Sequence, residues 1–262
     1  MVVHPLLSRT NVLGAWNAAP YLVNRSFVNW MQEHLDLVER HNADALDQAA
    51  GLLLPAVTGG GLVHVGGSGH SLAMVLEGFF RAGGLACVHP LYAPEISPLH
   101  GAWPATEAER RSGLAGPIME AAEPRPGDVV VIFSNSGANP YPVELAGAAR
   151  SYGLPVIAFV SGPSMAAAPA RAGVKLGEVA DLVIDTLVPP GDVSYPAEAP
   201  RTAALSSLAC VYLWNLLLAR MADRADLPLW VSANVPGGDE RNAELLERYS
   251  VRVPALRRSF TG

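Results

Sequence analysis

Two short segments rich in glycine and serine contain the residues whose types and spacing best suit chemistry. Segment 66–71 reads Gly-Gly-Ser-Gly-His-Ser, segment 134–139 reads Ser-Asn-Ser-Gly-Ala-Asn, and each follows an apolar run. Glycines let the backbone approach a ligand closely, while serine hydroxyls and unpaired amides at a helix start can hold an anion. We call these segments the first and second cradle and predict that they bind phosphate.

Two alternatives to a phosphate-ester site are less favoured: a purely structural turn and a nucleotide-binding site. A glycine-rich strand-to-helix turn is also an ordinary tight connection, so the first cradle alone is a moderate signal. The stretch Gly67-Ser68-Gly69 resembles the start of a dinucleotide fingerprint, but Leu72 stands where the third glycine is needed. The chain has no Gly-Lys-Ser/Thr phosphate loop either. A small phosphate ester therefore fits the residues better than a nucleotide.

Five apolar runs near Gly or Pro signals predict the strands that position the cradles. These runs are 62–65, 85–88, 128–133, 155–160 and 181–185. They lack polar alternation, as strands covered on both faces do, and most are separated by helix-like stretches at 71–82, 106–122, 142–152 and, more weakly, around 166–173. The pattern predicts an α/β fold: a doubly wound three-layer sandwich with a five-stranded parallel sheet of order 2-1-3-4-5, flavodoxin-like.

That strand order would bring the two cradles together. The carboxyl ends of strands 1 and 3 flank the switch point at which doubly wound sheets bind ligands. The first cradle follows the predicted strand 62–65, and the second follows 128–133. We therefore expect both cradles to face one ligand. One such turn could be purely structural, but two turns that meet at the same place make a purely structural role less favoured.

Helical segments flank the predicted core. Apolar residues recur at helical spacing over 21–54, which indicates one long helix or two short ones closed by Pro55. A strongly apolar helix is expected over 202–223, followed by a Gly-rich turn at 236–239 and a charged helix to about 250. We predict one domain over 1–262 with its core at about 56–186. The apolar surface of the flanking helices predicts a homo-oligomer, a dimer or higher.

Composition restricts the classes of partner. The chain has 262 residues, 50% of them hydrophobic, and a formal net charge of −6 without a basic run, which argues against nucleic-acid and membrane binding. Cys87 and Cys210 lie in apolar runs without metal-ligand spacing, so we expect neither a disulfide nor a metal site. Residues 1–14 lack signal-peptide features and 203–219 is too short to span a bilayer, so a cytoplasmic location is expected.

Both cradles resemble those of the sugar-isomerase (SIS) domain family, whose members bind phosphosugars. The resemblance extends to an uncharacterised bacterial branch related to phosphoheptose isomerases, through Ser71, Glu77 and the segments 81–85, 134–137, 178–181, 232–235 and 237–240. It implies that Ser71, Ser134 and Ser136 bind the phosphate of a sugar. The remaining binding residues that it implies are Gly67, Ser68, Gly69, Asn135, Gly137 and Asn139. No cofactor is implied.

The resemblance implies the fold and the ligand class but not the reaction. Our first hypothesis is an enzyme that interconverts aldose and ketose phosphates through an enediol, which needs a base and a second proton-handling group. Glu77 is the candidate base, with His70 and His100 as candidates for the second role. Simpler alternatives exist: Glu77 and Arg81, four residues apart, suit an ion pair, and His70 suits a helix cap. In phosphoheptose isomerases the catalytic carboxylate falls near Phe80 or Arg81 of this chain. A non-catalytic phosphosugar sensor is therefore the alternative function.

Overall fold

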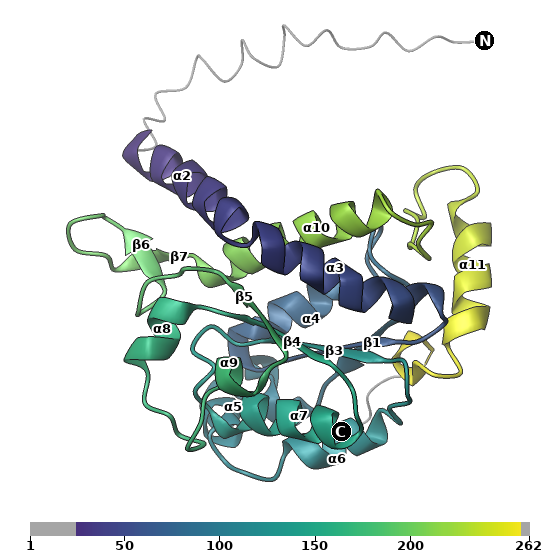
Figure 1. Ribbon diagram of the computed structural model, residues 1–262, viewed down its shortest axis with the longest axis horizontal. Coiled ribbons are helices and arrows are strands. Elements are labelled where there is room, and N and C mark those ends of the chain that lie inside the picture. Colours follow the sequence, from purple (N-terminus) through teal and green to yellow (C-terminus); the bar gives the residue numbers. More distant parts are fainter. Residues whose placement is uncertain (1–24, 258–262) are drawn as a thin grey trace, which may run out of the picture.

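A parallel five-stranded sheet forms the centre of the computed structural model, which describes residues 25–257 (Figure 1). Its strands are β1 (Val63–Gly67), β2 (Val88–Leu91), β3 (Val129–Phe133), β4 (Val156–Val160) and β5 (Leu182–Asp185). They are arranged in the order β2-β1-β3-β4-β5. All residues of β1 to β4 are buried, as the continuous apolar runs require. The predicted class and strand order are confirmed.

The second strand lies three residues later than predicted. Residues 85–88 are apolar enough for a strand, but Leu85 makes an antiparallel bridge to Leu229 and the Ala86 amide donates to the Pro228 carbonyl at 2.7 Å. The start of this run is therefore paired with a distant part of the chain. Pairing with β1 begins where the Cys87 carbonyl accepts the Val63 amide at 3.0 Å, and the register partners run from Val88 onward.

Helices cover both faces of the sheet and complete three layers (Figure 1). One layer contains α3 (Ala43–Thr58), α4 (Leu72–Gly78) and α10 (Ser206–Ala222). The opposite layer contains α5 (Ala102–Glu109), α6 (Ala115–Ala121), α7 (Pro140–Ser151) and the short α9 (Leu176–Val179). The remaining helices are α2 (Arg25–His41), α8 (Gly162–Ala167) and α11 (Gly238–Tyr249).

Three predicted helices have different bounds. The predicted helix 71–82 ends at Gly78, since Phe79 is extended and Phe80 has a positive φ of 49°. The predicted helix 106–122 is two helices, α5 and α6, separated at Gly113, whose φ is 96°. The weak helix near 166–173 is instead α8, which starts earlier because the Ser161 hydroxyl accepts the Ser164 amide at its first turn.

The N-terminal helical segment consists of two helices rather than one. They meet at Asn42, whose side chain donates to the Val38 and Asp185 carbonyls, both at 2.7 Å, and ties the junction to β5. Pro55 does not end the second helix as predicted, because α3 continues to Thr58. The carbonyl left without its usual donor belongs to the exposed Gly51, which water can reach. Residues 21–24 of the predicted segment lie outside the described residues.

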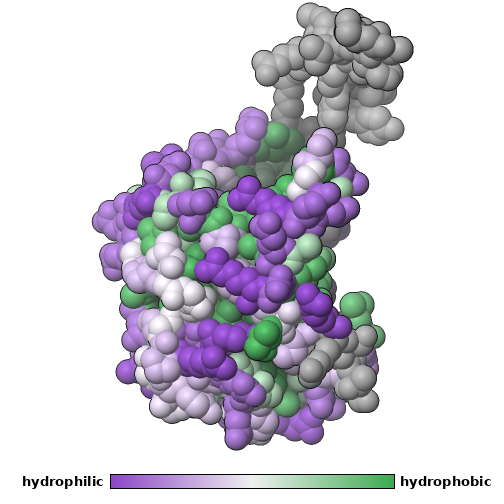
Figure 2. Space-filling model, turned by 90° about the vertical axis from the view of Figure 1, so that its right-hand side faces the viewer, coloured by the Kyte–Doolittle hydropathy of each residue, from purple (hydrophilic) through white to green (hydrophobic). Residues whose placement is uncertain are grey.

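The two proline-rich stretches contain short regular elements. Segment 89–104 includes the rest of β2 and the 3-10 turns Pro94–Ile96 and Pro98–His100, called η2 and η3. Segment 188–201 leads through β6 (Val193–Tyr195), which pairs with β7 (Thr202–Ala204), so α10 starts later than predicted. The charged helix α11 follows Gly237, whose φ of 77° makes the predicted glycine turn. The face that carries α11 is largely hydrophilic, with hydrophobic side chains between the polar ones (Figure 2).

Three findings bear on the predictions about membranes, disulfides and metals. Among the described helices, none is both long and apolar enough to cross a bilayer. Cys87 and Cys210 are buried free thiols, and burial raises the pKa of each to about 12. Within residues 25–257, no group of three His, Cys, Asp or Glu side chains is arranged to hold a metal ion.

Candidate functional site

The sheet register places the two cradles next to each other. Gly67 at the end of β1 is the register partner of Phe133 at the end of β3. The first cradle continues from Gly67 through the 3-10 turn Gly69–Ser71, η1, into α4, and the second continues from Phe133 into α7. Both therefore leave the carboxyl edge of the sheet at neighbouring strands, where ligands bind in this class of fold.

The first cradle needs its glycines. Gly69 has a φ of 56°, and a side chain on Gly67 would place a Cβ 2.9 Å from the Ser71 carbonyl oxygen. The Ser71 amide closes the turn by donating to the Ser68 carbonyl at 3.0 Å. Because Gly67 lets the backbone fold back so tightly, Ser68 and Ser71 lie on the same compact turn.

The second cradle is held mainly through its carbonyl groups. The Asn135 carbonyl accepts the Ser161 amide at 2.9 Å, and the Gly137 carbonyl accepts the Leu176 amide at 2.8 Å. Gly137 has a φ of 55° and is buried against Leu176. In the described part of the chain, the amides of Asn135 and Ser136 donate to no other protein group. The loop is thus rigidly held while these donors remain available.

The serines predicted to bind phosphate also have free hydroxyls. Within residues 25–257, no hydrogen bond joins the hydroxyl of Ser71, Ser134 or Ser136 to another protein group. Each of the three residues is partly exposed. Asn135 differs, because its amide nitrogen lies 3.4 Å from the Ser164 hydroxyl and its side-chain oxygen is buried without a partner.

A carboxylate that sequence reasoning did not single out joins the two cradles. Glu109, the last residue of α5, accepts the Ser68 hydroxyl on Oε2 and the Asn139 side-chain amide on Oε1, both at 2.8 Å. The side chain is half-buried, and its Oε2 would lie 3.7 Å from a Cβ on Gly69. Contacts of α5 with η1 and α7 bring the residue to this place.

A cation is linked to the same group. The Arg171 guanidinium donates to the Asn139 side-chain oxygen at 3.1 Å, and the Arg171 amide donates to the Ala138 carbonyl at 3.0 Å. Arg171 is exposed, so its positive charge lies at the surface beside the second cradle. The polar groups of the site thus form a chain from Ser68 through Glu109 and Asn139 to Arg171.

His70 and His100 are brought to one groove. This groove has a volume of about 560 Å³ and runs between α4 and the loop that follows β2. It begins at Gly69 and His70 of the first cradle and is otherwise mostly apolar, with Leu72, Phe79 and Tyr92 among its lining residues. Both histidines are exposed. The structure therefore places His70, within the first cradle, and His100, from the loop after β2, on the same groove.

Glu77 lies at the opposite end of α4 from the first cradle. Six residues of helix separate it from Ser71, which corresponds to roughly 9 Å along the axis. Its Oε1 is 3.0 Å from the Arg81 Nε and 3.4 Å from the Asn215 amide nitrogen. The predicted ion pair is thus present, although Arg81 follows the helix instead of sharing its face. The catalytic role of Glu77 stays a prediction.

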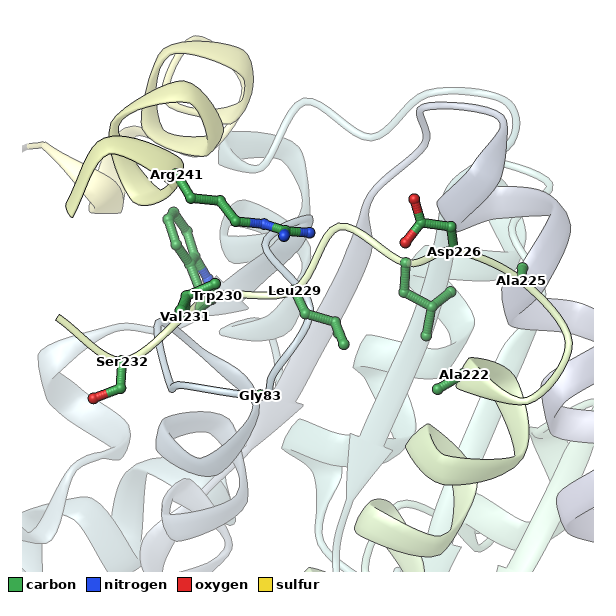
Figure 3. Close-up of a pocket in the computed structure, with 10 residues that line it drawn as sticks. Gly83, Ala222, Ala225, Asp226, Leu229, Trp230, Val231, Ser232 and Arg241 are labelled. Carbon is green, nitrogen blue, oxygen red and sulfur yellow. The ribbon is translucent and has the colours of Figure 1, made fainter. Parts of the chain in front are cut away.

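A separate hollow of about 590 Å³ lies away from the cradles (Figure 3). It is lined by Gly83, by the segment after α10 and by Arg241 of α11, and Arg241 and Asp226 both extend over it (Figure 3). Gly83 precedes β2, so this hollow lies toward the amino end of that strand, whereas the cradles lie at the carboxyl ends. It holds none of the residues predicted to bind phosphate.

Comparisons with known proteins identify the family. The SIS domain model matches residues 26–161. The chain is 35% identical to a UPF0309 protein of Geobacillus kaustophilus, covering 90% of this chain and 97% of that protein. It is 36% identical to a UPF0309 protein of Brucella anthropi, covering 82% and 90%.

A solved structure shares the fold. Phosphoheptose isomerase GmhA from Neisseria gonorrhoeae superimposes with a TM-score of 0.52 at 18% identity, covering 76% of this chain and 96% of that one. At this identity the likeness concerns the arrangement of the sheet and helices. Together with the family match and the close sequence relatives, it shows that the chain belongs to the SIS domain family and, within it, to the UPF0309 proteins.

Proposed function

We propose that this protein binds a phosphorylated sugar between its two cradles and interconverts the aldose and ketose forms. One observation carries the proposal: two glycine-serine turns leave neighbouring strands of the sheet with the hydroxyls of Ser71, Ser134 and Ser136 unpaired within the described residues. Unpaired hydroxyls and amides on a rigid turn suit the several acceptor oxygens of a phosphate. Membership of the SIS domain family agrees with this ligand class.

Isomerisation needs acid–base groups near the sugar as well as a phosphate anchor. His70 and His100 line the groove that begins at the first cradle, so a sugar held there has imidazoles at hand. Glu77 remains the proposed base from the sequence. The reaction moves hydrogen between neighbouring carbons without net oxidation, so we propose that it uses no redox cofactor.

A non-catalytic sensor of phosphosugars is the second candidate. The observation that favours it is the engagement of Glu77 by Arg81 and Asn215, which reduces the freedom of the predicted base. A sensor would keep the phosphate site and report the ligand through its assembly or a partner. The two candidates share a binding site and differ in turnover.

A thermal-shift screen against sugar phosphates, the matching free sugars and inorganic phosphate tests the shared part. Ligands that bind the native state raise the unfolding temperature by mass action. We expect stabilisation by one or more sugar phosphates that exceeds the effect of the free sugar and of phosphate alone. A turnover assay on the stabilising sugar then separates enzyme from sensor. Equal responses to all three ligand types would refute the proposed ligand class.

We also propose that the chain forms a homo-oligomer, a dimer or higher. The helix α10 is not the uncovered surface that its sequence suggested, because α3 packs over it and Trp214 is buried. Larger exposed fractions are found around the groove next to the first cradle, where Leu76 is 69% and Leu99 94% exposed, against 43% for Leu208 of α10. A second copy covering this face would remove them from water. Light scattering that gives the monomer mass would refute this.

A further inference from the structure

Glu109 occupies a place that stability alone does not explain. It is the last residue of α5, and the carboxyl end of a helix disfavours a negative charge. Its two partners, Ser68 and Asn139, belong to the two cradles rather than to the core. A carboxylate has thus been brought to the point where the proposed phosphate-binding loops meet.

The contacts of Glu109 suit a group that acts on the bound sugar. Ser68 donates a hydrogen bond to one carboxylate oxygen and Asn139 donates one to the other, and together they orient the group. The donors come from turns that the sheet and the carbonyl contacts of the second cradle hold in place. An oriented, partly exposed carboxylate beside an anchored substrate meets the geometric need of a general base.

We propose that Glu109 is the acid–base carboxylate of this protein, an inference that rests on the proposed phosphosugar site. With an open-chain aldose phosphate bound, the Glu109 carboxylate removes the proton from C2. The C–H electron pair forms the C1–C2 double bond while the carbonyl oxygen on C1 takes a proton from water, which gives an enediol. The hydroxide left from that water then removes the proton of the C2 hydroxyl and the C2 carbonyl forms. The C1–C2 electron pair takes the proton from Glu109 at C1, which restores both the water and the carboxylate. Hydrogen is conserved and no oxidant is required.

The experiment compares three carboxylate variants. The wild type, Glu109→Gln, Glu77→Gln and Glu107→Gln are incubated in D₂O with the aldose phosphate that stabilises the wild type most, and loss of the C2 hydrogen is followed by NMR. Affinity is measured in parallel by calorimetry. Glu107 is the matched control, because it lies two residues away on α5, is exposed and contacts neither cradle.

We expect Glu109→Gln to slow exchange at C2 by about 100-fold or more while the affinity stays equal or increases. An increase would follow from removing a negative charge beside the phosphate. Glu107→Gln should behave as the wild type. Glu109→Asp, which keeps the charge on a shorter side chain, should recover part of the rate and so distinguish lost chemistry from damaged folding.

The other outcomes separate the two proposals. Normal exchange by Glu109→Gln, or a loss confined to Glu77→Gln, overturns the role of Glu109 and leaves the proposed function standing. Wild-type protein that binds the sugar phosphate without exchanging C2 overturns the catalytic role and leaves a sensor. Absence of phosphosugar binding by the wild type overturns the proposed function itself.

Discussion

The two ends of the central sheet each hold a carboxylate at β1 and β3, but the surroundings differ. At the amino end, the Asp128 side chain is fully buried and is hydrogen-bonded to Leu62, His64, Arg125 and Arg252. At the carboxyl end, Glu109 is half-buried and bonded only to the cradles, next to serines whose hydroxyls have no partner within residues 25–257. The contrast is the one expected if the amino end holds the fold together and the carboxyl end binds the proposed ligand.

The network around Asp128 is dense. Oδ1 accepts the Leu62 amide at 2.8 Å, and Oδ2 lies 3.0 Å from the His64 Nε2 and accepts the Arg125 amide at 2.9 Å. The Arg252 guanidinium donates to Oδ2 at 2.7 Å and thereby ties the segment after α11 to the sheet. Burial opposes ionisation, but these hydrogen bonds outweigh it and hold the pKa of Asp128 well below its usual range.

The largest effect is expected when this network is broken. Asp128→Ala leaves the Arg252 charge without its partner and His64 without an acceptor, which should cost about 3–5 kcal/mol of the free energy of unfolding. Urea unfolding measures the loss. Asp226→Ala, an exposed carboxylate toward the same end of the sheet, is the control and should change stability by at most about 0.5 kcal/mol. Equal losses of unfolding free energy in Asp128→Ala and Asp226→Ala would contradict a structural role for the buried carboxylate.

The amino end should also make stability depend on pH. Burial lowers the pKa of His89 from 6.5 to about 4, and the charges of His64 and Arg252 add to this. Between pH 6.5 and 4, His89 is therefore protonated in the unfolded chain but neutral in the folded one. The free energy of unfolding falls by about 3 kcal/mol as the pH drops through this range. Asp128 contributes only at lower pH, because its stabilisation is lost below its unfolded value of 3.8.

Urea unfolding at pH 7 and pH 4 tests the role of His89. His89→Asn, which does not titrate in this range, should show a smaller difference between the two pH values than the wild type. Part of the slope should remain, since burial also lowers the pKa of His34. An unchanged pH dependence in the variant would show that His89 is not responsible.

Changes at the carboxyl end should affect ligands more than stability. Ser136→Ala removes a hydroxyl proposed to bind phosphate, and hydrogen bonds to charged groups contribute about 1.5–3 kcal/mol, so phosphosugar affinity should fall by about 10- to 100-fold. Calorimetric titration measures the affinity. Ser151→Ala on α7, whose hydroxyl bonds only to the Ala148 carbonyl, is the control. Unaltered affinity in Ser136→Ala would move the phosphate site elsewhere.

The fold was largely predictable because its main signals are local. Continuous apolar runs mark strands buried on both faces, and the five runs led to the observed order. The errors arose where distant contacts decide the structure. Leu85 pairs with Leu229, and no local pattern reveals this pairing. The predicted helix after the first cradle ends early, since Phe79 is extended and Phe80 takes a positive φ.

The same distinction applies to the candidate site. Each cradle is contiguous in sequence, so its glycines and serines could be identified together. Glu109 and Arg171 lie 41 and 32 residues from their partners Ser68 and Asn139. Glu109 ends a helix whose bounds were predicted incorrectly, and Arg171 lies in a turn after α8 where a helix was predicted. Before the fold is known, Glu109 cannot be distinguished from the solvent-exposed Glu107 on the same helix.

The smallest effect on stability is expected for Glu109→Gln. This variant therefore tests directly how Glu109 differs from Asp128. Glutamine can still accept from Ser68 or Asn139, and the loss of a negative charge relieves the carboxyl end of α5, so the free energy of unfolding should change by less than about 1 kcal/mol in either direction. Urea unfolding beside Asp128→Ala gives the contrast directly. A group kept for a ligand contributes little to the stability of the empty protein. If Glu109→Gln lowered the free energy of unfolding nearly as much as Asp128→Ala does, the carboxylate between the cradles would therefore support the fold instead.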